Sequence, residues 1–130
     1  MNFEEHAAKP VLSKHGIAVP PSQLAYDADA AAKAAAMIGP CVVKAQVPTG
    51  KRGKAGGIQL AATADDARVH AENIIGMSID GWPVEKVLIE GQVPIASELY
   101  AAVLNDHASK GPMVLFSLYS SLNSIFEMNL

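Results

Sequence analysis

The chain has 130 residues, of which 50% are hydrophobic, so it can bury a core and global disorder is not expected. Its 10 basic and 13 acidic residues give a formal net charge of −3, which argues against a general nucleic-acid-binding protein, because such proteins normally carry excess positive charge. No apolar segment is long enough to span a bilayer, and the acidic N-terminus has no apolar signal-like stretch, so a reducing, cytoplasmic compartment is expected.

Two helices are expected in the first forty residues. Residues 2–15 carry apolar side chains at four-residue spacing, which predicts a helix, but Pro10 removes a hydrogen bond inside it and should make it kinked or late to start. The alanine-rich segment 28–38 is a strong helix former, with Asp27 as its expected cap and Gly39 at its end. The segment between the two helices is expected to be extended.

A hairpin with a long loop is expected next. Residues 41–47 are largely β-branched and apolar, and a strand there places Cys41 on one face and Lys44 on the other. Residues 57–62 predict the second strand of the hairpin. Cys41 lies in an apolar run and is expected to be a buried free thiol, since a single cysteine has no partner within the chain.

The remaining elements are one helix and three strands. Thr63 begins the helical pattern, and Thr63 and Asp66 resemble a capping pair. After a loop around Asp80–Pro83, strands are expected at 84–90, 95–106 and 112–116. This order favours an α+β or mixed α/β domain over a regular βαβ winding.

The segment VKAQVPTGKRGKAGG (43–57) combines cations with glycine. Four of the chain's ten lysines and arginines lie in it: Lys44, Lys51, Arg52 and Lys54. It has neither the spacing of a Walker A motif nor that of GxGxxG. Glycine-rich backbone can approach an anion closely, which predicts a flap over phosphates, but a solvated hairpin tip fits the residue types equally well.

Three charged residues stand in apolar strand segments. Lys44 needs a partner such as a phosphate, unless it lies at a sheet edge and reaches solvent. Glu98 shares a strand face with apolar residues, so it should pair with a cation or accept hydrogen bonds from a ligand such as a ribose. Glu90 ends an apolar strand, where it either lines a nucleotide base or is exposed. The four histidines have no metal-ligand spacing, so no metal site is expected in the chain.

Three segments resemble the β subunit of succinyl-CoA synthetase (succinate–CoA ligase), in that family's order and at its spacing. The opening MNFEEHAAKPVLSKHGIAVP is similar to the family's N-terminus, VVKAQVPTGKRGKAGGI to its glycine-rich signature, and VLIEGQVPIASELYAAVLND to its third landmark. The resemblance covers about residues 1–116 and implies the N-terminal part of an ATP-grasp fold, in which a nucleotide lies between two α+β lobes.

The resemblance also implies which residues contact the nucleotide phosphates. It implies that Lys44 contacts the phosphates and that Lys51, Arg52 and Gly53 form the flap over them. Pro48 and Lys51 depart from the histidine and glycine of many members, so the choice between ATP and GTP stays open.

The base and ribose contacts come from the later segment. The resemblance implies that Glu90 and the backbone near Val93 meet the adenine edge, and that Glu98 accepts hydrogen bonds from the ribose hydroxyls. None of these residues is expected to be catalytic, because the family's phosphohistidine is carried by the partner α subunit.

The implied reaction converts ATP, succinate and CoA to succinyl-CoA, ADP and phosphate. Its Mg²⁺ ligands would lie beyond residue 130, so the chain is expected to be a truncated N-terminal part that is not competent alone, with residues 117–130 as a divergent tail. Two alternatives remain: the same portion of a malate–CoA ligase or ATP-citrate lyase relative, or a non-catalytic paralogue that binds nucleotide or a partner subunit.

Overall fold

The computed structural model describes residues 4–118 and 126–129, and the chain divides into two compact units, Met1–Val93 and Pro94–Leu130. The first unit contains an antiparallel sheet of four strands in the order β1-β6-β2-β3. These strands are β1 (Ser22–Ala25), β2 (Cys41–Ala45), β3 (Ile58–Ala61) and β6 (Val87–Gly91). Its helices are α1 (Glu5–Lys14), α2 (Ala28–Ile38) and α3 (Ala64–Ile74). The mixture of helices and strands confirms the expected fold class.

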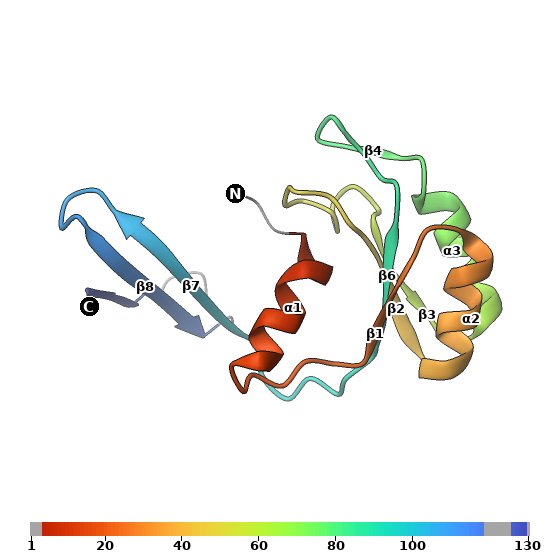
Figure 1. Ribbon diagram of the computed structural model, residues 1–130, viewed down its shortest axis with the longest axis horizontal. Helices are drawn as coiled ribbons and strands as arrows, with labels where there is room; N and C mark the ends of the chain where they lie inside the picture. Colours follow the sequence, from red (N-terminus) through yellow and green to blue (C-terminus); the bar gives the residue numbers. More distant parts are fainter. Residues whose placement is uncertain (1–3, 119–125, 130) are drawn as a thin grey trace. The chain divides into compact units, whose positions relative to one another are not determined.

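The sheet presents two chemically different faces. Figure 1 shows α2 and α3 on one face and α1 on the opposite side of the strands. Alternation along β2 turns Cys41, Val43 and Ala45 toward α2 and α3, where all three are fully buried. Lys44 is only half-buried and lies on the face toward α1. The predicted strand and the predicted burial of Cys41 are therefore confirmed.

Side-chain caps fix the starts of α2 and α3. The carboxylate of Asp27 accepts a hydrogen bond from the amide of Ala30 (2.7 Å), and Thr63 and Asp66 form a complete capping box. Both helices occur where the sequence predicts them. The first helix runs from Glu5 to Lys14 with Pro10 inside it, so Pro10 does not delay its start. Among the described residues, no helix combines the length and hydropathy needed to cross a membrane.

A short hairpin replaces the loop that the sequence predicts around residues 80–83. It consists of β4 (Ser78–Ile79) and β5 (Trp82–Pro83), and the turn between them has positive φ at Asp80 and Gly81. The sequence predicts the loop but not the two strands beside it, because each is only two residues long and too short to show a periodic pattern.

The second unit contains an antiparallel sheet in the order β7-β8-β9. Its strands are β7 (Leu99–Asp106), β8 (Gly111–Leu118) and β9 (Phe126–Asn129). The strand predicted at 95–106 begins only at Leu99, because the register pairs Leu99 with the last residue of β8. The tail predicted at 117–130 lies in part outside the described residues, which omit 119–125 and 130, and the domain assignment stays a prediction.

Close packing of α2 against α3 generates the first testable prediction. Ala34 of α2 is fully buried, whereas Ala36, two residues further along the same helix, is exposed. Ala34→Leu should overpack this interface and lower the free energy of unfolding by about 1–3 kcal/mol. Ala36→Leu is the matched control and should change it by less than about 0.5 kcal/mol. Urea unfolding followed by circular dichroism measures both, and equal effects would show that the interface is not tightly packed.

Candidate functional site

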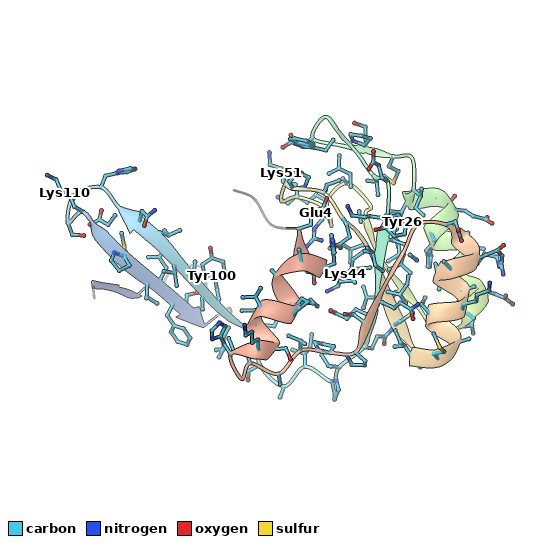
Figure 2. The ribbon with its side chains drawn as sticks, viewed as in Figure 1. Glu4, Tyr26, Lys44, Lys51, Tyr100 and Lys110 are labelled. Atoms are coloured by element: carbon cyan, nitrogen blue, oxygen red, sulfur yellow. The ribbon has the colours of Figure 1, made fainter. Side chains whose placement is uncertain are left out.

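Five charged side chains meet between the sheet and α1, and we call them the charged cluster. They are Glu5 and Lys9 of α1, Lys44 of β2, Arg52 of the following loop and Glu90 of β6. Figure 2 shows Lys44 between the strands and α1. The side chains of all five are between 8% and 22% exposed, so their charges are largely removed from water. Charges in such a place must pair with one another.

Lys44 and Glu90 form the centre of the charged cluster. The register pairs Lys44 with Leu88 and Val42 with Glu90, so the two charged residues are diagonal neighbours on the same face of adjacent strands. The ammonium nitrogen of Lys44 lies 2.6 Å from Oε1 of Glu90. Lys9 contacts the other oxygen of Glu90. Each carboxylate oxygen of Glu90 therefore faces a cation.

Glu5 connects the strand, the loop and its own helix. Its Oε1 accepts a hydrogen bond from Lys44 (3.0 Å) and lies 3.0 Å from Nζ of Lys9. Its Oε2 lies 3.0 Å from Nη1 of Arg52. Burial by itself would raise the pKa of Glu5, but hydrogen bonds and attraction from Lys44 and Lys9 outweigh it and lower the pKa to about 2. Lys9 experiences the reverse balance, because desolvation lowers its pKa despite the attraction of Glu5.

Polar contacts also hold the first turn of α1 beside the charged cluster. Glu4 forms an ion pair with Lys86 (2.8 Å), and the backbone amide of His6 donates to Oε1 of Gln46 (2.9 Å). Gln46 is buried, and its amide group donates to the backbone carbonyl of Ala45 (3.1 Å). No residue of α1 is buried, so the helix is held to the sheet mainly by polar and charged contacts.

The glycine-rich loop (residues 48–57) leaves the sheet next to the charged cluster. Arg52 turns back toward the sheet and donates a hydrogen bond from Nη1 to the carbonyl oxygen of Ala45 (3.0 Å). Lys51 and Gly53 are exposed on the loop, and Figure 2 shows Lys51 near its tip. Lys51 has a φ of 62°, a left-handed conformation that non-glycine residues seldom adopt. The loop thus presents cations and backbone beside Lys44.

The β4–β5 hairpin packs against the base of this loop. The hydroxyl of Thr49 donates to Oδ2 of Asp80 (3.1 Å). A Cβ on Gly57 would lie 2.7 Å from Cδ1 of Ile79, 3.0 Å from Cβ of Ala45 and 3.2 Å from the carbonyl oxygen of Arg52, so any larger residue would require these neighbours to shift. The hairpin therefore restrains the loop at both its start and its end.

The structure brings three of the sequence-predicted residues together: Lys44, Arg52 and Glu90. Lys44 is on a central strand and pairs with two carboxylates, which excludes a sheet-edge lysine that reaches solvent. Glu90 is 6% exposed, so it is not an exposed strand-end charge.

Val93 and Glu98 are not members of the charged cluster. Val93 is exposed at the end of the first unit, and Glu98 is exposed in the second unit, just before β7. Glu98 does not share an apolar strand face as expected, since the strand begins after it.

Two members of the charged cluster, Glu5 and Lys9, were missed by sequence reasoning. Their spacing of four residues on a helix is a visible signal, but such pairs are common on solvated helix surfaces. Only the distant pairing with Lys44 and Glu90 distinguishes them from an ordinary surface pair.

Comparison with known proteins gives a consistent result. The family model described as an ATP-grasp domain matches residues 2–123. The ADP-forming succinate–CoA ligase β subunit of Natronomonas pharaonis is 44% identical over 124 residues, which cover 95% of this chain and 33% of that protein. The GDP-forming succinate–CoA ligase β subunit of Thermus thermophilus is 43% identical over 118 residues, covering 90% of this chain and 31% of that protein.

A solved structure shares the fold. The dinucleotide-forming acetyl-coenzyme A synthetase 1 of Ca. Korarchaeum cryptofilum superimposes with a TM-score of 0.84 at 24% identity, covering 98% of this chain and 59% of that chain. The present chain spans about a third of the length of the curated relatives it matches.

The low pKa of Glu5 leads to a prediction about acid stability. Its folded-state pKa of about 2 lies below the ordinary 4.5, so its ion pairs stabilise the fold above about pH 4.5 and this contribution is lost as the pH falls toward 2. Glu5→Gln should therefore lower the free energy of unfolding at pH 7 by roughly 2 kcal/mol, reduced from the full shift because the side chain is partly exposed. Urea unfolding from pH 7 to pH 2.5 should show the two proteins converging, and a constant difference would contradict the assignment.

The restrained loop leads to a prediction about Gly57. Gly57→Ala should lower the free energy of unfolding by about 1–3 kcal/mol, because the added Cβ meets the side chain of Ile79 and the packed backbone of the loop. Gly50→Ala is the matched control in the same loop, since a Cβ there has no atom within 4 Å. Thermal unfolding compares the two variants, and an unchanged midpoint for Gly57→Ala would show that the hairpin does not restrain the loop.

Proposed function

The chain belongs to the ATP-grasp family, and on that basis we propose that the charged cluster and the glycine-rich loop bind the phosphates of a nucleoside triphosphate. The observation that carries the proposal is the position of Lys44. It is a half-buried cation beside a glycine-rich, cationic loop, and the three cations of the charged cluster outnumber its two carboxylates. A site with surplus positive charge and little water favours a polyanion.

Different parts of the site would act in different ways. Lys44 supplies a charge fixed by Glu90, and Arg52 supplies a planar guanidinium at the base of the loop. Lys51 and Gly53, which are exposed, form the flap, where glycine lets backbone amides approach the phosphate oxygens. Positioning and neutralisation of this kind are what phosphoryl transfer chiefly needs from a protein.

The base and ribose contacts are proposed from the family resemblance. Glu90 and the backbone near Val93 are assigned to the adenine edge, and Glu98 to the ribose hydroxyls. Glu90 has a second role in this proposal, because its carboxylate fixes Lys44 and contacts Lys9. It therefore couples the phosphate end of the site to the base end.

For the longer protein type to which this chain is similar, we propose the reaction of a succinate–CoA ligase. ATP, succinate and CoA would give succinyl-CoA, ADP and phosphate, with an α subunit as partner; the similarity to the ADP-forming and GDP-forming β subunits supports this. No group of three or more His, Cys, Asp or Glu suited to a metal occurs in the part of the chain that the structure describes. The proposal for these residues is therefore nucleotide binding, with no step of the reaction assigned to Mg²⁺.

Calorimetric titration of the 130-residue chain with ATP and Mg²⁺, and in parallel with GTP and Mg²⁺, tests the proposal. We expect saturable binding of at least one nucleotide. Lys44→Ala should weaken this binding tenfold or more, because the variant loses the attraction between the lysine and the phosphates, and a loss of about 1.4 kcal/mol corresponds to a factor of ten in affinity. Lys33→Ala is the matched control, since Lys33 is an exposed lysine on α2, which covers the opposite face of the sheet.

A second variant separates lost binding from lost folding. Lys51→Ala removes an exposed side chain, so it should leave the circular dichroism spectrum unchanged while weakening binding about two- to fivefold. The proposal fails if the wild-type chain shows no binding at millimolar nucleotide, or if Lys44→Ala and Lys33→Ala bind equally well.

A further inference from the structure

The carboxylate of Glu5 occupies the place among the cations that an incoming anion would need. Its two oxygens lie 3.0 Å from nitrogen atoms of Lys9, Lys44 and Arg52. With Glu90 included, the charged cluster holds three positive and two negative charges, a net charge of +1. Without Glu5 the net charge would be +2. Glu5 therefore reduces the attraction of this site for any other anion.

One oxygen of Glu5 is held less well than the other. Oε2 is buried and has no aligned hydrogen bond, although it lies 3.0 Å from Nη1 of Arg52. The same nitrogen of Arg52 directs its hydrogen bond to the carbonyl oxygen of Ala45. A buried oxygen without an aligned donor carries an unrecovered desolvation cost, so a better-aligned anion could replace the contact between Glu5 and Arg52. Oε2 of Glu90 is likewise buried without an aligned donor, but its carboxylate belongs to the sheet itself.

The helix that carries Glu5 has little apolar attachment to the sheet. None of its residues is buried, and Val11 and Leu12 are 52% and 41% exposed. Glu4 and His6 hold the first turn through Lys86 and Gln46, at positions outside the charged cluster. Withdrawal of the Glu5 carboxylate would therefore open no cavity in a packed core, and the helix would retain other contacts.

We propose that Glu5 is an internal substitute for a phosphate group, which the phosphates of a bound nucleotide displace from Lys44 and Arg52. Lys9, on the same helix, keeps its contact with Glu5 after the exchange. This inference rests on the proposed function and adds to it a residue that sets the affinity of the site. Glu5 opposes binding in this scheme, whereas a residue that merely positioned Lys44 for phosphate would assist binding.

The sign of one substitution separates these two roles. Glu5→Gln removes the competing charge but keeps an amide oxygen that can accept a hydrogen bond from Lys44. We expect it to tighten binding of inorganic pyrophosphate and of ATP about three- to tenfold. This is the size of effect expected when one nearby negative charge no longer competes with the ligand for the cations of a partly screened site. Calorimetric titration at pH 7 with each of the two ligands measures this effect.

Glu4→Gln is the matched control. It removes the same charge from the adjacent position of the same helix, but its partners Lys86 and His6 do not belong to the charged cluster. It should change either affinity less than twofold. An equal gain in both variants would assign the effect to net charge alone and would overturn the proposal.

Hydrogen exchange supplies a readout that a purely structural role would not change. Saturation with ATP should increase exchange of the α1 amides, since the helix loses a contact, while exchange in β2 and β6 stays constant or falls. Circular dichroism confirms that both variants are folded before they are titrated.

The possible failures are distinguishable. If wild type binds and Glu5→Gln binds equally or more weakly, the present inference is wrong and the proposed function stands. If neither protein binds either ligand, the proposed function fails and the inference fails with it. Binding by Glu5→Gln alone would support the inference, because the internal anion would then block the wild-type site.

Discussion

Burial of the Glu90 carboxylate is the constraint on which the rest of the first unit depends. A carboxylate in the middle of a sheet can remain charged only if cations reach it, and here Lys44 and Lys9 do so from a neighbouring strand and from a helix. Lys44, Lys9 and Arg52 would repel one another if the Glu5 carboxylate did not lie among them. One buried acid thus contributes to the position of α1, through Lys9, and to the direction of the Lys44 side chain.

The two faces of the sheet have different roles, because one is packed with apolar side chains and the other carries the charged residues. On the side of α2 and α3, alternate residues of β2 and β6 are fully buried apolar side chains, such as Val43 and Ile89, which the hydrophobic effect holds in place. On the other side, the same strands carry Lys44 and Glu90. Because strand side chains alternate, a rigid apolar face fixes the positions of the charged residues without taking part in their chemistry.

Local signals in the sequence predicted most of the elements correctly. Asp27 and Thr63 indicate where their helices begin, because a capping side chain bonds to an amide within three residues. Alternation along residues 41–45 indicates which face of the sheet each side chain occupies. Non-local contacts could not be read in this way. Glu5 lies 39 residues from Lys44, and no pattern within either segment indicates that they meet.

The same limit explains the errors at Glu98 and in the β4–β5 hairpin. Whether a residue belongs to a strand depends on a partner strand, and the register of β7 with β8 begins at Leu99. The resemblance to a known family indicated Lys44, Arg52 and Glu90, but it did not indicate that Lys44 pairs directly with Glu90 and is linked to Arg52 through Glu5. Those contacts depend on the packing of α1, which only the structure describes.

The position of α1 along the chain has a consequence for biosynthesis. The helix is synthesised before β2 and β6, the strands whose side chains receive it, and Glu90 emerges about eighty residues after it. Until then, a short charged helix with an internal proline has no sheet to bind and is only marginally helical. The helix can therefore reach its contacts only after both strands have been synthesised.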